Sequence, residues 1–100
     1  MTFYAYENKI LKIDGLLNLT KLTELHLHHN LIRKITQLEN MPLLTKLYLD
    51  HNCISKLEGL ERCSRLEELS LACQYLPPLV EFTFDDHSIA TISVLRFMII

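Results

Sequence analysis

Apolar residues follow a spacing of three, then two, along most of the chain. In the stretch LTELHLHHNLIRKITQLENMPL, residues 22–43, Leu25 and Leu27 are separated by a polar residue. Residues two apart share one face of a strand but lie on different sides of a helix. Each LxL segment is therefore predicted to be a short strand that buries both leucines on one side.

The same spacing returns every 22 residues, with an amide after each strand. The aligned columns are Leu22, Leu44 and Leu66; Leu25, Leu47 and Leu69; Leu27, Leu49 and Leu71; Asn8, Asn30, Asn52 and Gln74; Ile32, Ile54 and Leu76; and Ile35, Leu57 and Leu79. A fixed period of this length predicts a solenoid, because one unit cannot bury its apolar face alone. We expect a single domain over 1–100, with units at about 1–21, 22–43, 44–65 and 66–91 and a partial unit at 92–100.

The amide column is predicted to form a ladder where the chain bends after each strand. An amide side chain offers two donors and an acceptor, so Asn30 and Asn52 can satisfy backbone groups that leave the sheet at the bend. Gly15 and Gly59 share a second column, which indicates a backbone position that favours no side chain. Gln37 occupies the same column, so this requirement is not strict.

The spelling LxxLxLxxNxIxxIxxL resembles leucine-rich repeats. The unit length and the second Ile or Leu of each unit are similar to the SDS22-like class. This resemblance implies an α/β fold class, a right-handed β-α superhelix. It would have a short parallel sheet on its concave face and turns or 3-10 segments on its convex face.

The segment LEELSLACQYLPPLVEFTFDDHSIATIS carries a closer resemblance. Gln74, Leu76, Pro77, Phe84 and Asp85 are similar to a motif of the testis leucine-rich repeat proteins, the family of protein phosphatase-1 regulatory subunit forty-two. The resemblance implies a non-enzymatic protein that binds the phosphatase catalytic subunit and is associated with centrosomes and microtubule structures. A generic scaffold for another cytoskeletal or ciliary partner is the alternative.

A short phosphatase-docking signal consists of a basic residue, then Val or Ile, any residue, and Phe or Trp. Val80 and Phe82 have this spacing, but Leu79 stands where the basic residue is needed, so the signal is absent there. Any contact with the phosphatase is therefore expected to use the concave sheet.

The polar residues that alternate with the strand leucines are the candidate binding residues. The candidates for protein binding are Tyr4, Tyr6, Glu24, His26, His28, Lys46, Tyr48, Asp50, Glu68 and Ser70. Tyrosine is enriched among interface hot spots, and solenoids offer extended concave surfaces. For any single position the alternative is a solvated cross-strand pair, such as Glu24 with Lys46.

Charge and composition limit the classes of partner and the locations that the sequence favours. The net charge of −2 gives no electrostatic case for nucleic acid or an anionic membrane. The start, MTFYAYENKI, lacks a basic segment followed by an apolar core, so no secretory signal is expected. The longest apolar run is interrupted by Arg96 and is too short to span a bilayer. We therefore expect a cytoplasmic protein.

The three cysteines, Cys53, Cys63 and Cys73, cannot all pair with one another. Cys63 shares its column with Leu19 and Met41, which predicts a core position. Reduced thiols in the cytoplasm fit this arrangement.

Two site chemistries are weaker alternatives. His26, His28 and Asp50 share one face and offer ligand types that suit zinc, but a fourth ligand is not evident. Cys73 and His51 share the bend column and could form a thiol–imidazole pair. Phosphate-binding and hydrolase motifs are absent, so no cofactor and no catalytic residue is expected.

The repeat register changes between Leu66 and the last candidate unit, which begins at Ile92. Pro77 and Pro78 favour an insertion, and Asp85 or Asp86 is predicted to cap a short helix over His87–Thr91. Ile92, Leu95 and Phe97 then resume the LxxLxL spacing with four extra residues. The alternative is an apolar tail without fixed structure at Val94–Ile100.

Neither end carries the polar cover that a solenoid needs. We therefore expect a truncated array. Its open ends, with Phe97 and Ile99 on a terminal strand, could self-associate.

Overall fold

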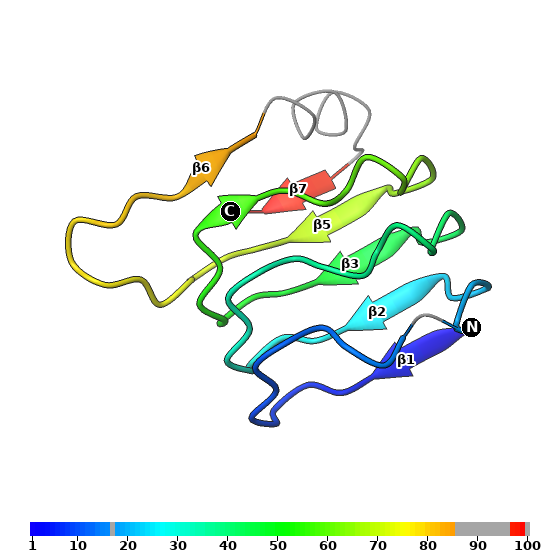
Figure 1. Ribbon diagram of the computed structural model, residues 1–100, viewed down its shortest axis with the longest axis horizontal. Coiled ribbons are helices and arrows are strands. Elements are labelled where there is room, and N and C mark those ends of the chain that lie inside the picture. Colours follow the sequence, from blue (N-terminus) through cyan, green and yellow to red (C-terminus); the bar gives the residue numbers. More distant parts are fainter. Residues whose placement is uncertain (17, 86–96, 100) are drawn as a thin grey trace.

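A computed structural model describes residues 1–16, 18–85 and 97–99. Five short parallel strands form one sheet in the order β1-β2-β3-β5-β7 (Figure 1). Their bounds are β1 Thr2–Tyr4, β2 Glu24–His26, β3 Lys46–Tyr48, β5 Glu68–Ser70 and β7 Phe97–Ile99. A second, two-stranded parallel sheet pairs β4 (Lys56–Leu57) with β6 (Thr83–Phe84) on the return side of the turns.

The strand register confirms that the LxL pairs are successive rungs of one sheet. Leu25 lies opposite Leu47, and Leu47 lies opposite Leu69, and all three are fully buried. Burying such a side chain contributes roughly 1.5–3 kcal/mol. Adjacent rungs are also tied at their starts, where the Thr45 hydroxyl donates to the carbonyl oxygen of Thr23 at 3.0 Å. The solenoid predicted from the period is thus present.

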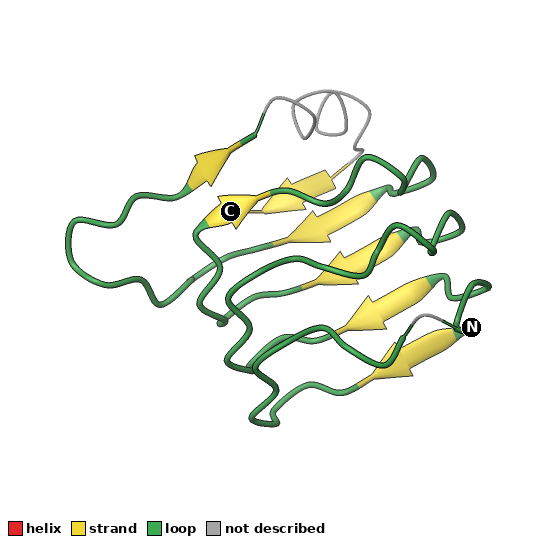
Figure 2. Cartoon of the chain, in the orientation of Figure 1, coloured by secondary structure: helices red, strands yellow, loops and turns green. Residues whose placement is uncertain are grey.

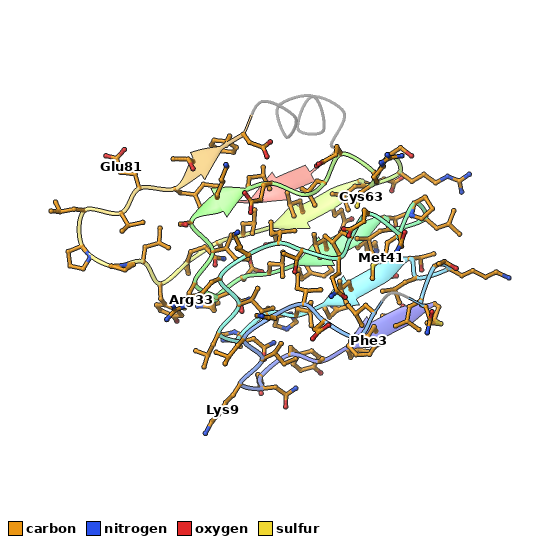
Figure 3. All side chains as sticks on the ribbon, in the orientation of Figure 1. Phe3, Lys9, Arg33, Met41, Cys63 and Glu81 are labelled. Atoms are coloured by element: carbon orange, nitrogen blue, oxygen red, sulfur yellow. The ribbon has the colours of Figure 1, made fainter. Side chains whose placement is uncertain are left out.

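The chain returns from each strand to the next through turns, and the described residues contain no helix (Figure 2). Two consecutive tight turns precede each of the strands β2, β3 and β5. Met41 N donates to Leu38 O at 3.1 Å, and Leu44 N donates to Met41 O at 3.2 Å. The same pair of bonds recurs one unit later through Cys63, whose side chain is 1% exposed. Cys63 is therefore a core residue, as its column predicts, and lies at the same end of the strands as Met41 (Figure 3).

The predicted amide ladder is confirmed at the bends. Asn52 Nδ2 donates to Leu27 O and Leu49 O, each at 3.0 Å, and its Oδ1 accepts from Ile32 N at 3.0 Å. Gln74 continues the ladder, because its Oε1 accepts from Ile54 N at 2.9 Å. Each of these amide side chains therefore joins the backbones of two neighbouring turns.

The glycine column has left-handed backbone geometry throughout. φ is +74° at Gly15, +63° at Gln37 and +76° at Gly59, a region that favours glycine. At Gly59 a Cβ would also lie 2.8 Å from the carbonyl oxygen of Ile35, whereas at Gly15 it would meet nothing within 4 Å. Backbone conformation therefore favours glycine at all three positions of this column. At Gly59 the lack of space for a Cβ favours it as well.

Two details of the fourth unit differ from the sequence expectation. Leu79 does not continue the column of Ile35 and Leu57: it is fully exposed with φ +68°. Phe84 instead pairs with Leu57 in the β4–β6 sheet. The physical reason is the insertion around Pro77, which breaks the period before the chain rejoins the return side.

The last rung is also displaced relative to the expectation. Met98 lies opposite Leu69, three positions later than the predicted Leu95. Phe97–Ile99 forms the paired strand β7, which contradicts, for these residues, the alternative of an apolar tail without fixed structure. The predicted helix at His87–Thr91 and residue Arg96 lie outside the described residues. Within the described part of the chain, no helical segment has the length and apolarity needed to span a bilayer.

Candidate functional site: the concave sheet face

The side of the five-stranded sheet turned away from the core, here called the concave face, carries side chains in rows across the strands. The rows follow from the register, which places His26 beside Tyr4 and Tyr48, and Lys46 beside Glu24 and Glu68. Because the leucines between them point inward, these side chains contribute little to the core. The structure thus brings the predicted candidates of β1, β2, β3 and β5 onto one surface.

Aromatic and imidazole rings follow one another along this face at the strand spacing, tilted in the first row and stacked in the second. The ring centroids of Tyr4 and His26 are 4.5 Å apart, and those of His26 and Tyr48 are 4.7 Å apart. A second row pairs Tyr6 with His28 at 4.6 Å, with an angle of 10° between the ring planes. Parallel strands lie about 4.8 Å apart, so the sheet itself sets this stacking distance.

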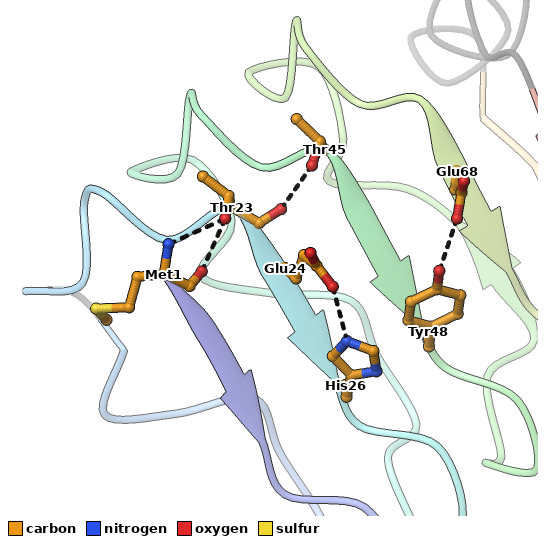
Figure 4. Close-up of polar contacts among 7 residues, drawn as sticks. All are labelled: Met1, Thr23, Glu24, His26, Thr45, Tyr48 and Glu68. Atoms are coloured by element: carbon orange, nitrogen blue, oxygen red, sulfur yellow. Dashed lines mark hydrogen bonds and ion pairs between the residues drawn. The ribbon is translucent and has the colours of Figure 1, made fainter.

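Two carboxylates hold the first ring row in place (Figure 4). Glu24 Oε1 lies 3.2 Å from His26 Nε2, and Tyr48 donates its hydroxyl to Glu68 Oε2 at 2.6 Å. The bond to Glu68, together with partial burial, raises the pKa of Tyr48 to about 12. The side chains of His26 and Glu24 are 17% and 30% exposed, so both remain accessible.

These contacts revise the expected pairing of Glu24. The register makes Lys46 its neighbour on the next strand, but the carboxylate of Glu24 contacts the imidazole of His26. An ion pair joins Lys56 to Glu58 on the return side of the turns. Lys46 is therefore left as a cation between two carboxylates of the same row.

Ser70 differs from the other candidates because its side chain is buried at 6% exposure. Its hydroxyl donates to Asp50 Oδ1 at 2.5 Å, and Ala72 N donates to the same oxygen at 2.7 Å. The sequence pattern predicts a contact residue at this position. In the structure the Ser70 hydroxyl instead bonds to Asp50 on the neighbouring rung and so positions that carboxylate.

His28 lies partly buried beside Tyr6 and Asp50. Burial first, and then the nearby His29 and His26, lower the pKa of His28 below its ordinary value of 6.5. Its Nδ1 is buried and has no hydrogen-bond partner in the described part of the chain. The lowered pKa favours the neutral form of the His28 imidazole near pH 7.

A further ring row lies at the bends and was not among the sequence candidates. The rings of His29 and His51 stack at 4.3 Å with 8° between their planes, and His51 Nδ1 lies 3.0 Å from the Tyr75 hydroxyl. The ring centroids of His28 and His29 are 5.7 Å apart, so this row continues the concave face to its edge. The one-unit spacing of His29 and His51 is the signal that could have revealed it. Tyr75 lies outside that spacing.

The geometry does not support a zinc site at His26, His28 and Asp50 or a thiol–imidazole pair of Cys73 and His51. Among residues 1–16, 18–85 and 97–99, no group of three or more His, Cys, Asp or Glu side chains is arranged to hold a metal ion. His51 bonds to Tyr75 and not to Cys73. Burial, with two nearby glutamates, raises the pKa of the Cys63 thiol to about 11, which opposes thiolate formation. All three cysteines are free.

Comparisons with known proteins agree with this architecture. A family profile described as Leucine Rich repeats (2 copies) matches residues 2–40. The crystal structure of internalin C2 from Listeria monocytogenes is similar, with a TM-score of 0.71 and 20% sequence identity. That match covers 97% of this chain and 50% of the internalin chain, so the chain spans half the length of that structure. The search of curated protein sequences gives no match.

The chain therefore has the leucine-rich repeat fold that its period predicts. Repeats of this kind indicate a scaffold for protein–protein interaction, and the fold is typically non-enzymatic.

Proposed function

We propose that this leucine-rich repeat solenoid binds another protein through its concave face. The observation that carries the proposal is the ring row Tyr4–His26–Tyr48, whose ring centroids lie 4.5 and 4.7 Å apart with the planes tilted by 34° and 30°. Glu24 contacts His26, and Glu68 accepts the hydroxyl of Tyr48. Rings that are already fixed lose little conformational freedom on binding, and tyrosine combines a large apolar surface with a polar tip. The row is accessible, with Tyr4 64% exposed.

The charged residues around the rings indicate which surface charge the partner should have. Glu24, Asp50 and Glu68 outnumber Lys46 on the concave face, so a partner surface with basic or neutral polar groups is favoured. Guanidinium groups stack well on aromatic rings and pair with carboxylates, so they suit both features of this face. The proposed contact residues are Tyr4, Tyr6, Glu24, His26, His28, Lys46, Tyr48, Asp50 and Glu68, with Ser70 acting through Asp50.

The catalytic subunit of protein phosphatase-1 is the partner we propose, with the chain as a regulatory subunit of the SDS22-like class. The support is the resemblance of the segment from Gln74 to Asp85 to the testis leucine-rich repeat proteins. The same resemblance supports a cytoplasmic location at centrosomes or microtubule structures. The competing candidate is another cytoskeletal or ciliary protein held by the same face.

A binding titration with purified phosphatase-1 catalytic subunit tests the proposal. The variant His26→Ala/Tyr48→Ala removes two central rings, and Arg62→Ala/Arg65→Ala is a matched control at exposed positions on the turns. Loss of two hot-spot side chains is expected to weaken binding by at least about thirtyfold, whereas the control retains wild-type affinity. Far-UV circular dichroism checks that both variants remain folded.

Affinity capture from cell lysate separates the two parts of the proposal. If the catalytic subunit does not bind but another protein is captured and lost in the ring variant, the phosphatase assignment is wrong and the concave face stands. If the folded ring variant retains every specific partner, the concave face is not the binding surface.

A further inference from the structure

Three lysines occupy equivalent positions on the return side of successive turns. Lys12, Lys34 and Lys56 are each one 22-residue unit apart, and all three are exposed. The backbones of these return segments are joined directly, since Leu31 N donates to Ile10 O at 2.9 Å and Cys53 N donates to Ile32 O at 2.8 Å. The lysines therefore form a column of like charges on neighbouring rungs, with Arg33 beside the middle one.

Folding by itself does not favour this column, because like charges on adjacent rungs repel one another. Lys56 is compensated by Glu58, whose Oε2 lies 3.6 Å from Lys56 Nζ. Within the described residues, no ion pair compensates Lys12, Arg33 or Lys34. The carboxylate that lines the same groove, that of Asp14, accepts from Gly15 N at 2.8 Å and from Gln37 Nε2 at 3.0 Å. Its bonding capacity is thus partly used within the fold.

The uncompensated cations border a groove between the first two turns. This groove has a volume of about 690 Å³ and is lined by 11–14 on one side and by Arg33, Lys34, Thr36 and Gln37 on the other. Its apolar part includes Leu11, which is 63% exposed and not part of the core. A cavity of this size accommodates several side chains of a peptide. The combination of an exposed leucine with a cluster of cations is unexplained by the packing of the solenoid.

We propose that this groove, formed by 11–14 and by Arg33, Lys34, Thr36 and Gln37, binds an acidic peptide segment of a partner protein that also carries an apolar side chain. Carboxylates of the segment pair with Lys12, Arg33 and Lys34, and its apolar side chain packs on Leu11. This site lies on the return side of the turns and does not depend on the function proposed for the concave face. The solenoid would thus hold two partners, or two parts of one partner.

A peptide fits the groove better than a nucleic acid does. The cations are concentrated at one short groove, whereas nucleic-acid binding uses many phosphate contacts spread along a backbone. An exposed leucine offers nothing to phosphates, whereas it favours an apolar side chain among carboxylates.

Fluorescence polarisation with labelled synthetic peptides tests the inference on the full chain. The probe peptide alternates aspartate or glutamate with leucine or phenylalanine. One control peptide replaces its acidic residues with lysine, and a second replaces its apolar residues with serine. The probe is expected to bind and to weaken from about 50 mM to about 300 mM salt, whereas neither control peptide binds comparably.

Variants of the chain locate the site. Lys12→Glu/Lys34→Glu should weaken probe binding by about tenfold or more, and the matched charge reversal Arg62→Glu/Arg65→Glu should leave it unchanged. Leu11→Ser keeps the charges and is expected to weaken binding of the probe but not of the serine control peptide. The ring variant His26→Ala/Tyr48→Ala should bind the probe normally, which separates this site from the concave face.

Three outcomes would overturn the inference. Equal losses in the two charge reversals would indicate binding to the general surface charge. Tighter binding of duplex nucleic acid, abolished by the Lys12/Lys34 reversal, would assign the groove to phosphates. Self-association of the chain that disappears in the same variant would assign it to a second copy.

Discussion

The fully buried side chain of Asn52 provides the most direct test of the amide ladder. Its Nδ2 donates to Leu27 O, Leu49 O and Asp50 O, and its Oδ1 accepts from Ile32 N. The perturbation is Asn52→Ala, which removes all four contacts and leaves the surrounding backbone in place.

The expected loss of stability follows from the partners that remain. Leu27 O keeps a bond from Asn30 Nδ2 at 3.0 Å, and Leu49 O keeps one from Gln74 Nε2 at 2.8 Å. Asp50 O likewise keeps its bond from the backbone of the preceding turn. Only Ile32 N–H, among the groups that contact Asn52, is left without a partner.

An orphaned buried donor costs about 1–3 kcal/mol, and each lost bond to a carbonyl that keeps another partner costs about 0.5 kcal/mol. The free energy of unfolding is therefore expected to fall by about 2.5–4.5 kcal/mol in Asn52→Ala. Asn52→Leu should not restore it, because a leucine fills the space but leaves Ile32 N–H unsatisfied.

Urea unfolding followed by far-UV circular dichroism measures these differences. The matched control is Asn8→Ala at the exposed end of the same column, where Nδ2 donates to Ala5 O at 3.1 Å and Tyr6 O at 3.2 Å. Water can replace both bonds there, so a loss below about 1 kcal/mol is expected. A loss in Asn52→Ala no larger than that in Asn8→Ala, or full recovery in Asn52→Leu, would refute the ladder as a source of stability.

Three further predictions concern backbone space and titration. Gly59→Ala should lower the free energy of unfolding by more than Gly15→Ala in the same urea assay, because both pay for positive φ but only the first places Cβ 2.8 Å from a backbone oxygen; equal losses would contradict this. In an ultraviolet titration one tyrosine should ionise with a pKa of about 12, and Tyr48→Phe should remove that step. Because its folded pKa lies above the unfolded value of 10, the contribution of Tyr48 to stability is full below pH 10 and is lost as pH rises toward 12. For His28 the folded pKa is lowered, so its contribution is present above pH 6.5 and declines as pH falls through the folded pKa. His28→Gln should flatten this acid limb in unfolding measured from pH 7.5 to pH 5, and an unchanged slope would contradict the assignment.

Much of the fold could be predicted from individual columns. Leu47 identifies a strand residue because its spacing from Leu49 excludes a helical face, and Asn52 identifies a bend because its amide serves two turns. Prediction failed where the period is broken. Leu79 matches its column by counting alone, yet it is fully exposed, and Phe84 takes the place beside Leu57.

The candidate site was predictable as a surface but not as a set of contacts. Alternation placed His26 and Tyr48 together on one face, which the register confirms. It did not distinguish Ser70, which is covered by Asp50, and it omitted the stack of His29 on His51 at the bends. Burial and ring stacking depend on rotamers and on neighbours from other turns, which a spacing pattern does not contain.

The sequence by itself determined the period, the inward leucines and the amide column, and these specify a solenoid. Each of these features repeats along the chain, so its partner in space is the same residue one unit away. Only the tertiary structure decided that Glu24 holds His26 and that the cations Lys12 and Lys34 border a groove with an exposed leucine. Those contacts join side chains whose directions are set by packing between turns, and a linear pattern carries no information on that packing.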